Sequence, residues 1–151
     1  MTDRPPPCPE TILVVDDDPA IRELILVVLK MNGYRVLEAA SGEEALQLIG
    51  SFPAPIHLIL ADVRMPGMTG RELTEQARQR TPEIKVLLIS GYTNEANFHE
   101  WASLRGVGFL PKPFNVEDLE RTVREALDGY CLRNTPSKSQ LHDAVISRTI
   151  P

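Results

Sequence analysis

Two short apolar segments of the chain end abruptly in carboxylates. Residues 12–15 (ILVV) run into Asp16, Asp17 and Asp18, and residues 58–61 (LILA) run into Asp62. A short run of branched apolar residues bounded by turn formers is typical of a strand buried on both faces. An acid at the carboxyl end of such a strand lies in the crevice where open α/β sheets bind ligands. Several acids gathered there would suit a hard cation and phosphate chemistry.

Other predicted strands also end in polar residues, and their types extend this chemistry. Glu38, Ser90 and Lys112 each follow an apolar run. A carboxylate nucleophile can accept a phosphoryl group as an acyl phosphate, provided that cations offset the charge of the phosphoryl oxygens. Lys112 would supply a compact positive charge and Ser90 a hydroxyl donor. Each residue alone is as easily a cap, a turn former or a surface residue, but together they favour phosphoryl transfer.

The segments between these strands carry helix signals. The predicted N-caps are Asp18, Ser41, Thr69 and Asn115, and Ser41 and Thr69 are each followed three residues later by Glu, as in a capping box. Asn32-Gly33 is expected to end the first helix, and a weaker helix is expected over about 94–104. The faces predicted to be buried comprise Ile21, Leu24, Ile25, Val28 and Leu29 in the first helix and Val116, Leu119, Val123, Ala126 and Leu127 in the last.

Five strands that alternate with five helices predict an α/β fold, a doubly wound parallel sheet with helices on both faces. The expected strands cover about residues 11–16, 34–38, 57–61, 84–90 and 107–110. Right-handed crossovers place every strand's carboxyl end at the same edge. The pattern alone leaves the strand order open. A flavodoxin-like order of 2-1-3-4-5 would bring Asp16, Asp17 and Asp62 together.

Length and composition fit one soluble domain. The chain has 151 residues and a net charge of −5, which argues against nucleic acid as a partner. We expect a proline-rich lead-in over residues 1–9, one domain over 10–129 and a flexible tail over 130–151. No signal peptide or membrane span is visible, and Cys8 and Cys131 form no disulfide framework, so we expect a cytoplasmic protein without membrane contact.

Four motifs resemble the response-regulator receiver domains of two-component signalling. ILVVDDDP, LILADVRMPGMTG, VLLISGYT and GFLPKPF occur in the family's order and spacing, and the likeness extends over about residues 10–128. The amino-acid sequences of these motifs are most similar to those of receivers attached to, or working with, hybrid histidine kinases. The resemblance implies a flavodoxin-like, single-domain receiver. It would signal by changing conformation and catalyse only its own phosphorylation and dephosphorylation.

The resemblance also implies a role for each residue of the site. Asp62 would be the phosphoacceptor, and Ser90 and Lys112 would bind the phosphoryl oxygens. Asp18 is better interpreted as a helix cap. The ligands implied for Mg²⁺, or for Mn²⁺ in its place, are the carboxylates of Asp16, Asp17 and Asp62 and the backbone carbonyl of Arg64.

Further positions concern switching and phosphoryl lifetime. In the family, the hydroxyl at the position of Ser90 moves toward the phosphate and the aromatic at the position of Phe109 turns inward. Arg64, Gly91 and Tyr92 occupy positions that tune phosphoryl lifetime. The resemblance further implies a cis Lys112–Pro113 bond. His57 departs from the family pattern, and we expect it to be structural and not to touch the site.

The implied partners are a histidine kinase or a histidine phosphotransfer protein, and a downstream protein that the sequence does not identify. The fourth helix, fifth strand and fifth helix are the expected contact surface of a monomer or weak dimer. One alternative is a haloacid-dehalogenase-like phosphotransferase in which Asp16 is the nucleophile of an Asp16-x-Asp18 motif. However, Pro19 stands where that family's motif has small or hydroxyl residues, which opposes this alternative. The other alternative is a binding module that keeps the receiver fold without phosphorylation.

Overall fold

The computed structural model describes residues 9–91 and 96–128, and in this part five strands alternate with five helices, as predicted. Their bounds are β1 (Thr11–Val15), α1 (Pro19–Met31), β2 (Arg35–Ala39), α2 (Gly42–Ser51), β3 (Leu58–Asp62), α3 (Gly70–Arg80), β4 (Lys85–Ser90), α4 (Ala96–Leu104), β5 (Gly108–Pro111) and α5 (Val116–Asp128). Tyr92, the predicted start of the fourth helix, most of the lead-in and the predicted tail lie outside the described residues.

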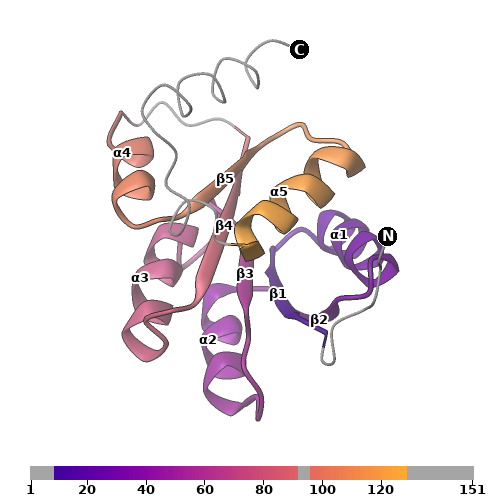
Figure 1. The fold of residues 1–151 in the computed structure, drawn as a ribbon. Coiled ribbons are helices and arrows are strands. Elements are labelled where there is room, and N and C mark those ends of the chain that lie inside the picture. The colour runs from indigo at the N-terminus through magenta and orange to yellow at the C-terminus, as the bar shows by residue number, and fades with distance from the viewer. Residues whose placement is uncertain (1–8, 92–95, 129–151) are drawn as a thin grey trace.

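The five strands form one parallel sheet in the order β2-β1-β3-β4-β5, which confirms the flavodoxin-like fold. Figure 1 shows the strands fanning across the centre of the molecule. On the neighbouring strands β1 and β3, Val15 is paired with Ala61, so the next residues, Asp16 and Asp62, emerge at the same level of the sheet edge. The register thus brings together carboxylates 46 residues apart in the sequence.

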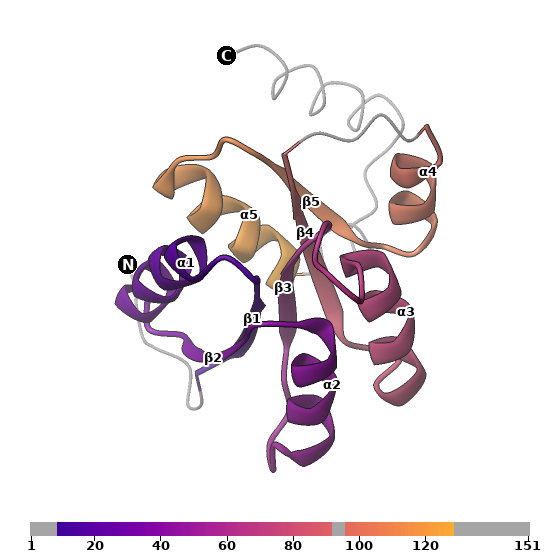
Figure 2. The same cartoon turned by 180° about the vertical axis from the view of Figure 1, so that it is seen from behind.

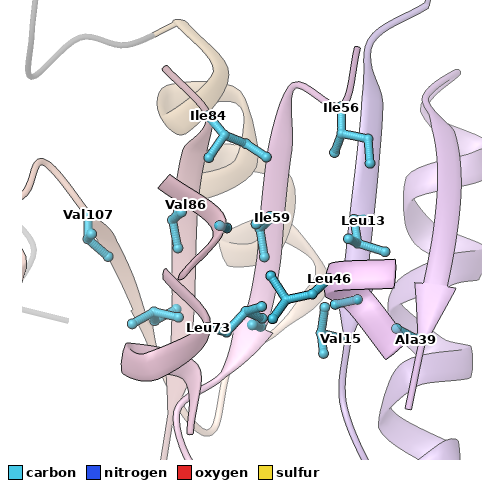
Figure 3. Close-up of a cluster of buried hydrophobic side chains, with 14 of the residues drawn as sticks. Leu13, Val15, Ala39, Leu46, Ile56, Ile59, Leu73, Ile84, Val86 and Val107 are labelled. Carbon is cyan, nitrogen blue, oxygen red and sulfur yellow. The ribbon is translucent and has the colours of Figure 1, made fainter. Parts of the chain in front are cut away.

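Helices cover both faces of the sheet. α1 and α5 lie on one face, and α2, α3 and α4 lie on the other (Figures 1 and 2). Each face has its own apolar core, because alternate residues of a strand point to opposite sides. On the α2–α4 side, Leu13, Ile59 and Val86 form a row across three strands, which Figure 3 shows. On the α1–α5 side, β1 and β3 contribute Ile12, Val14, Leu58 and Leu60.

The predicted caps form with one variation. Asp18 accepts a hydrogen bond from the N–H of Ala20, and Asn115 accepts one from Asp118. Thr69 and Glu72 make a complete capping box. Ser41 caps α2 by accepting the N–H of Glu44, but the Glu44 carboxylate reaches the N–H of Ala40 instead of that of Ser41. Two backbone N–H groups at the start of α2, those of Ala40 and Glu44, are therefore hydrogen-bonded, but Ser41 and Glu44 do not form the reciprocal capping box that the sequence predicted.

The predicted buried faces are wrong at two positions. Leu24 of α1 is 49% exposed and Val116 of α5 is 45% exposed. The buried side of α1 is centred on Ile25 and Leu29, so Leu24 falls at one margin of the apolar stripe while Leu26 at the other margin is buried. Val116 opens α5, and the buried residues of this helix begin only at Leu119.

Trp101 of α4 makes side-chain contacts with two residues of α3. Its ring is buried, and its Nε1 donates a hydrogen bond of 2.8 Å to the carboxylate of Glu75. The guanidinium of Arg71 lies 5.0 Å from the ring centroid, within the range of a cation–π contact. Arg105, at the end of α4, forms an ion pair with the same Glu75. Among the described residues, no helix is long and apolar enough to cross a bilayer.

Gly70, the first residue of α3, lies directly beneath the end of β3. A Cβ at this position would come within 2.6 Å of the backbone oxygen of Asp62 and 3.1 Å of Leu88. We expect Gly70→Ala to lower the free energy of unfolding by about 1–3 kcal/mol, because backbone must shift to admit the methyl group. Urea denaturation measures this.

Gly50→Ala is the matched control for that substitution. The added Cβ would meet only the flexible Arg80 side chain, at 3.4 Å, and alanine favours the helix. The control should therefore gain up to about 1 kcal/mol. Equal stability of Gly70→Ala and the wild type would show that the β3–α3 junction is not tightly packed.

Candidate functional site

The carboxyl edge of the sheet brings together three of the predicted site side chains, Asp16, Asp62 and Lys112. Backbone hydrogen bonds fix the strand ends that carry them. The N–H of Val63 donates to the carbonyl of Ile89 at 2.9 Å, and the N–H of Lys112 donates to the carbonyl of Ser90 at 2.8 Å. The positions of these side chains therefore follow from the sheet itself and not from a loop.

Asp62 is held at both carboxylate oxygens. Its Oδ2 accepts a hydrogen bond of 2.9 Å from the Nζ of Lys112, and its Oδ1 accepts one of 3.0 Å from the N–H of Arg64. The residue is 8% exposed, so the ion pair lies at the mouth of the site, where it is partly shielded from water. The carboxylate is thus oriented, and its side chain is 11% exposed.

Asp16 has one satisfied oxygen and one free oxygen. Its Oδ1 accepts the N–H of Asp18 at 2.8 Å, while its buried Oδ2 has no hydrogen-bond partner in the described part of the chain. Burial raises the pKa of Asp16, the Asp18 N–H opposes that rise, and the charge of Asp62 adds to it. A buried oxygen without a donor costs free energy, so this site would be more stable with a positive ligand.

Lys112 is the cation that these acids share. Burial alone lowers the pKa of its ammonium group, but the hydrogen bond and charge of Asp62, with the charges of Asp16 and Asp18, raise the pKa above its ordinary value. Lys112 therefore stays charged throughout the neutral range. One lysine cannot neutralise the three carboxylates of Asp16, Asp18 and Asp62, so the net charge of this group of side chains stays negative.

The remaining predicted residues lie around this group. Ser90 ends β4 and is 4% exposed, and Phe109 of β5 packs partly buried against the core on the α2–α4 side. Asp17 is exposed, and no hydrogen bond or ion pair of the described residues involves its carboxylate. Gly91 lies next to Lys112, whose Cδ would be 3.8 Å from a Cβ added to Gly91. The Lys112–Pro113 bond is cis, as expected.

Two polar residues of the predicted strand ends do not join the site. Glu38 is exposed and forms an ion pair with Arg22 at 2.9 Å. His57 lies at the opposite end of β3, where its Nδ1 accepts the N–H of Thr11 at 2.9 Å, so it has a structural contact, as expected. Among the described residues, no three His, Cys, Asp or Glu side chains are already arranged as metal ligands.

Sequence reasoning missed Arg22. Its Nη1 donates a hydrogen bond of 2.6 Å to the backbone carbonyl of Asp16, and its Nε contacts Glu38. The available signal was its position four residues after the cap Asp18. A helical side chain points back toward the helix N-terminus and covers the preceding turn.

Residues 12–124 match the family model described as the response regulator receiver domain. The chain belongs to that family. This receiver domain is similar to part of the sensor kinase CckA of Brucella abortus (strain 2308), with 38% identity over 118 residues that cover 78% of this chain and 12% of the kinase. The chain spans between 12% and 61% of the length of eight curated relatives that it matches.

Two solved structures give the same result for the fold. The receiver domain of the hybrid histidine kinase CckA has 38% identity and a TM-score of 0.66, covering 78% of this chain and 98% of that one. A CheY-like receiver domain protein from Methanospirillum hungatei JF-1 has 34% identity and a TM-score of 0.72, covering 80% and 94%. Receiver domains are signalling modules of two-component systems, where they interact with histidine kinases or phosphotransfer proteins.

We expect Asp16→Asn to raise the free energy of unfolding of the metal-free protein at pH 7. Asparagine keeps the oxygen that accepts the Asp18 N–H and removes the buried charge. Because the folded state raises the pKa of Asp16 above 3.8, the charged form weakens folding as the pH rises through that pKa. The gain should therefore shrink as the pH falls toward 3.8.

Urea denaturation in the presence of a chelator, at several pH values, measures the gain. Asp17→Asn is the control: it removes an exposed charge one residue away, and its gain should be smaller because solvent screens that charge. A loss of stability in Asp16→Asn that stays constant with pH would contradict the view that this carboxylate is destabilising.

Proposed function

We propose that the chain is a phosphoacceptor of a two-component phosphorelay. It takes a phosphoryl group from a phosphohistidine of a histidine kinase or phosphotransfer protein onto Asp62. The observation that carries the proposal is the oriented, partly buried Asp62–Lys112 pair beside the unpaired Oδ2 of Asp16. A nucleophile, a fixed cation and an open anionic position are the parts that phosphoryl transfer to a carboxylate requires.

The transfer itself is an in-line displacement. An oxygen of Asp62 attacks the phosphorus, the P–N bond to the donor histidine breaks, and its electron pair returns to the imidazole nitrogen. Lys112 already lies 2.9 Å from Asp62 and remains to offset the charge of the phosphoryl oxygens. Ser90, at the neighbouring strand end, would donate its hydroxyl to one of those oxygens.

The residues present fit Mg²⁺ as the resident cofactor, with Mn²⁺ as a substitute. Mg²⁺ prefers oxygen ligands, uses one or two carboxylates and keeps several waters, so a preformed cluster of three side chains is not required. Asp16 and Asp17 would hold it, with Asp62 and the backbone carbonyl of Arg64 as further ligands. When bound, the ion supplies the positive charge that lets a carboxylate approach a phosphoryl group.

Signalling would follow from the response of Ser90 and Phe109 to the phosphoryl group. Ser90 leads into the β4–α4 connection, and Phe109 lies on β5, so both border the surface of α4, β5 and α5. We propose that this surface contacts the downstream protein, or a second copy of the chain in a weak dimer. Arg64, Gly91 and Tyr92 would set how long the phosphoryl group persists. The chain would then catalyse only its own phosphorylation and dephosphorylation.

Acetyl phosphate with Mg²⁺ should label the protein with one phosphoryl group. The label should require Mg²⁺, disappear in Asp62→Asn and persist in the control Asp18→Asn, because asparagine also caps a helix. Intact-mass measurement detects the label, and borohydride trapping with peptide mapping locates it. A label on Asp16 would favour the haloacid-dehalogenase-like alternative. No Mg²⁺-dependent label from any donor, including a phosphotransfer protein, would favour the phosphorylation-independent binding module.

A further inference from the structure

Of the carboxylates of the site, that of Asp17 has the fewest contacts to hold it in place. It is exposed, and its side chain enters no hydrogen bond or ion pair of the described residues. Contacts made by residues outside a metal's own ligand set orient the ligands and raise their affinity for the metal. The affinity of Asp17 for a cation therefore depends on what fixes its backbone.

Both peptide groups that flank Asp17 are held by side chains. The carbonyl of Asp16 belongs to the same planar peptide as the N–H of Asp17, and it accepts the 2.6 Å hydrogen bond from Arg22. On the other side, the N–H of Asp18 donates 2.8 Å to the Oδ1 of Asp16. Since the two planes determine the backbone dihedrals of Asp17, they fix the direction of its Cα–Cβ bond and so limit the positions that its carboxylate can reach.

Arg22 is itself fixed in place. Its N–H donates to the carbonyl of Asp18 in the first turn of α1, and its Nε forms the 2.9 Å ion pair with Glu38 at the end of β2. Its side chain is 18% exposed, so the guanidinium is partly shielded from water. The planar fork thus joins α1, β2 and the β1–α1 turn, which a lysine could not do.

We propose that Arg22 is a positioning residue for the cation ligand Asp17, and that Glu38 acts through Arg22. This proposal rests on the proposed function, because it concerns the affinity of the Asp16–Asp17 pair for Mg²⁺. Charge and geometry predict opposite results. A nearby guanidinium repels a divalent cation, so as a mere charge Arg22 would weaken binding. As a positioning residue it strengthens binding.

Calorimetric titration of the unphosphorylated protein with Mg²⁺ separates these two effects. We expect Arg22→Met to raise the dissociation constant about tenfold, and Arg22→Lys, which keeps the charge but not the fork, to raise it by a similar factor. Methionine and lysine have helix propensities close to that of arginine, so α1 should persist. Arg121→Met, which removes an exposed ion pair within α5, is the control and should leave the dissociation constant unchanged.

Two further measurements test the mechanism. Glu38→Gln should weaken Mg²⁺ binding in the wild type but have no effect in the Arg22→Met background, since the two residues act in one chain of contacts. In labelling by acetyl phosphate, Arg22→Met should raise the Mg²⁺ concentration for half-maximal rate about tenfold and leave the rate at saturating Mg²⁺ within about twofold.

Each other outcome overturns the proposal. Tighter Mg²⁺ binding by Arg22→Met would mean that Arg22 acts only as a counter-charge. Unchanged binding, in a wild type that binds Mg²⁺ and is labelled on Asp62, would mean that it only supports the fold. A wild type that neither binds Mg²⁺ nor is labelled would overturn the proposed function as well, so the two failures are distinguishable.

Discussion

The parallel register of β1 and β3 is the constraint on which the rest of the site depends. Because Val15 is paired with Ala61, the acids that follow on both strands emerge side by side, at an edge formed by buried strands. The apolar cores on both faces fix that register, since a slip by one residue would move each side chain of a strand into the other core, where the close-packed neighbours leave a space of a different shape. The sheet therefore holds like charges together that would separate in a flexible chain.

Several contacts around this edge reduce the cost of the crowded charges. Lys112 pairs with Asp62, the N–H of Asp18 satisfies one oxygen of Asp16, and Arg22 holds the turn between them. α3 begins directly under Asp62 at a residue with no room for a Cβ. The site is thus built from the ends of rigid elements, and what remains unsatisfied, chiefly the Oδ2 of Asp16, is the chemically open position.

The features predictable from the sequence are those with a local cause. Buried strands, caps such as Asp18 and Thr69, and the helix stop at Asn32 each depend on residues within one turn of one another. Periodicity identified the apolar stripe of α1, but the rotation of that helix on the sheet left Leu24 exposed. Contacts between distant elements had no local signal: the hydrogen bond from Trp101 to Glu75 joins two residues that lie 26 positions apart on different helices, and only the fold brings them together.

Arg22 illustrates the same limit at the site itself. The strand-end acids, Ser90 and Lys112 stand out in the sequence because their combination in one domain rarely occurs by chance, whereas an arginine in the first turns of a helix is ordinary. The proposed role of Arg22 depends on two features of the fold. Its side chain extends back over the turn that precedes α1, and Glu38 at the end of β2 lies close enough to form an ion pair with it. Residues that perform chemistry are thus recognisable from their type and their place in the sequence. Residues that position them are recognisable only in the folded structure, where the neighbouring elements lie beside them.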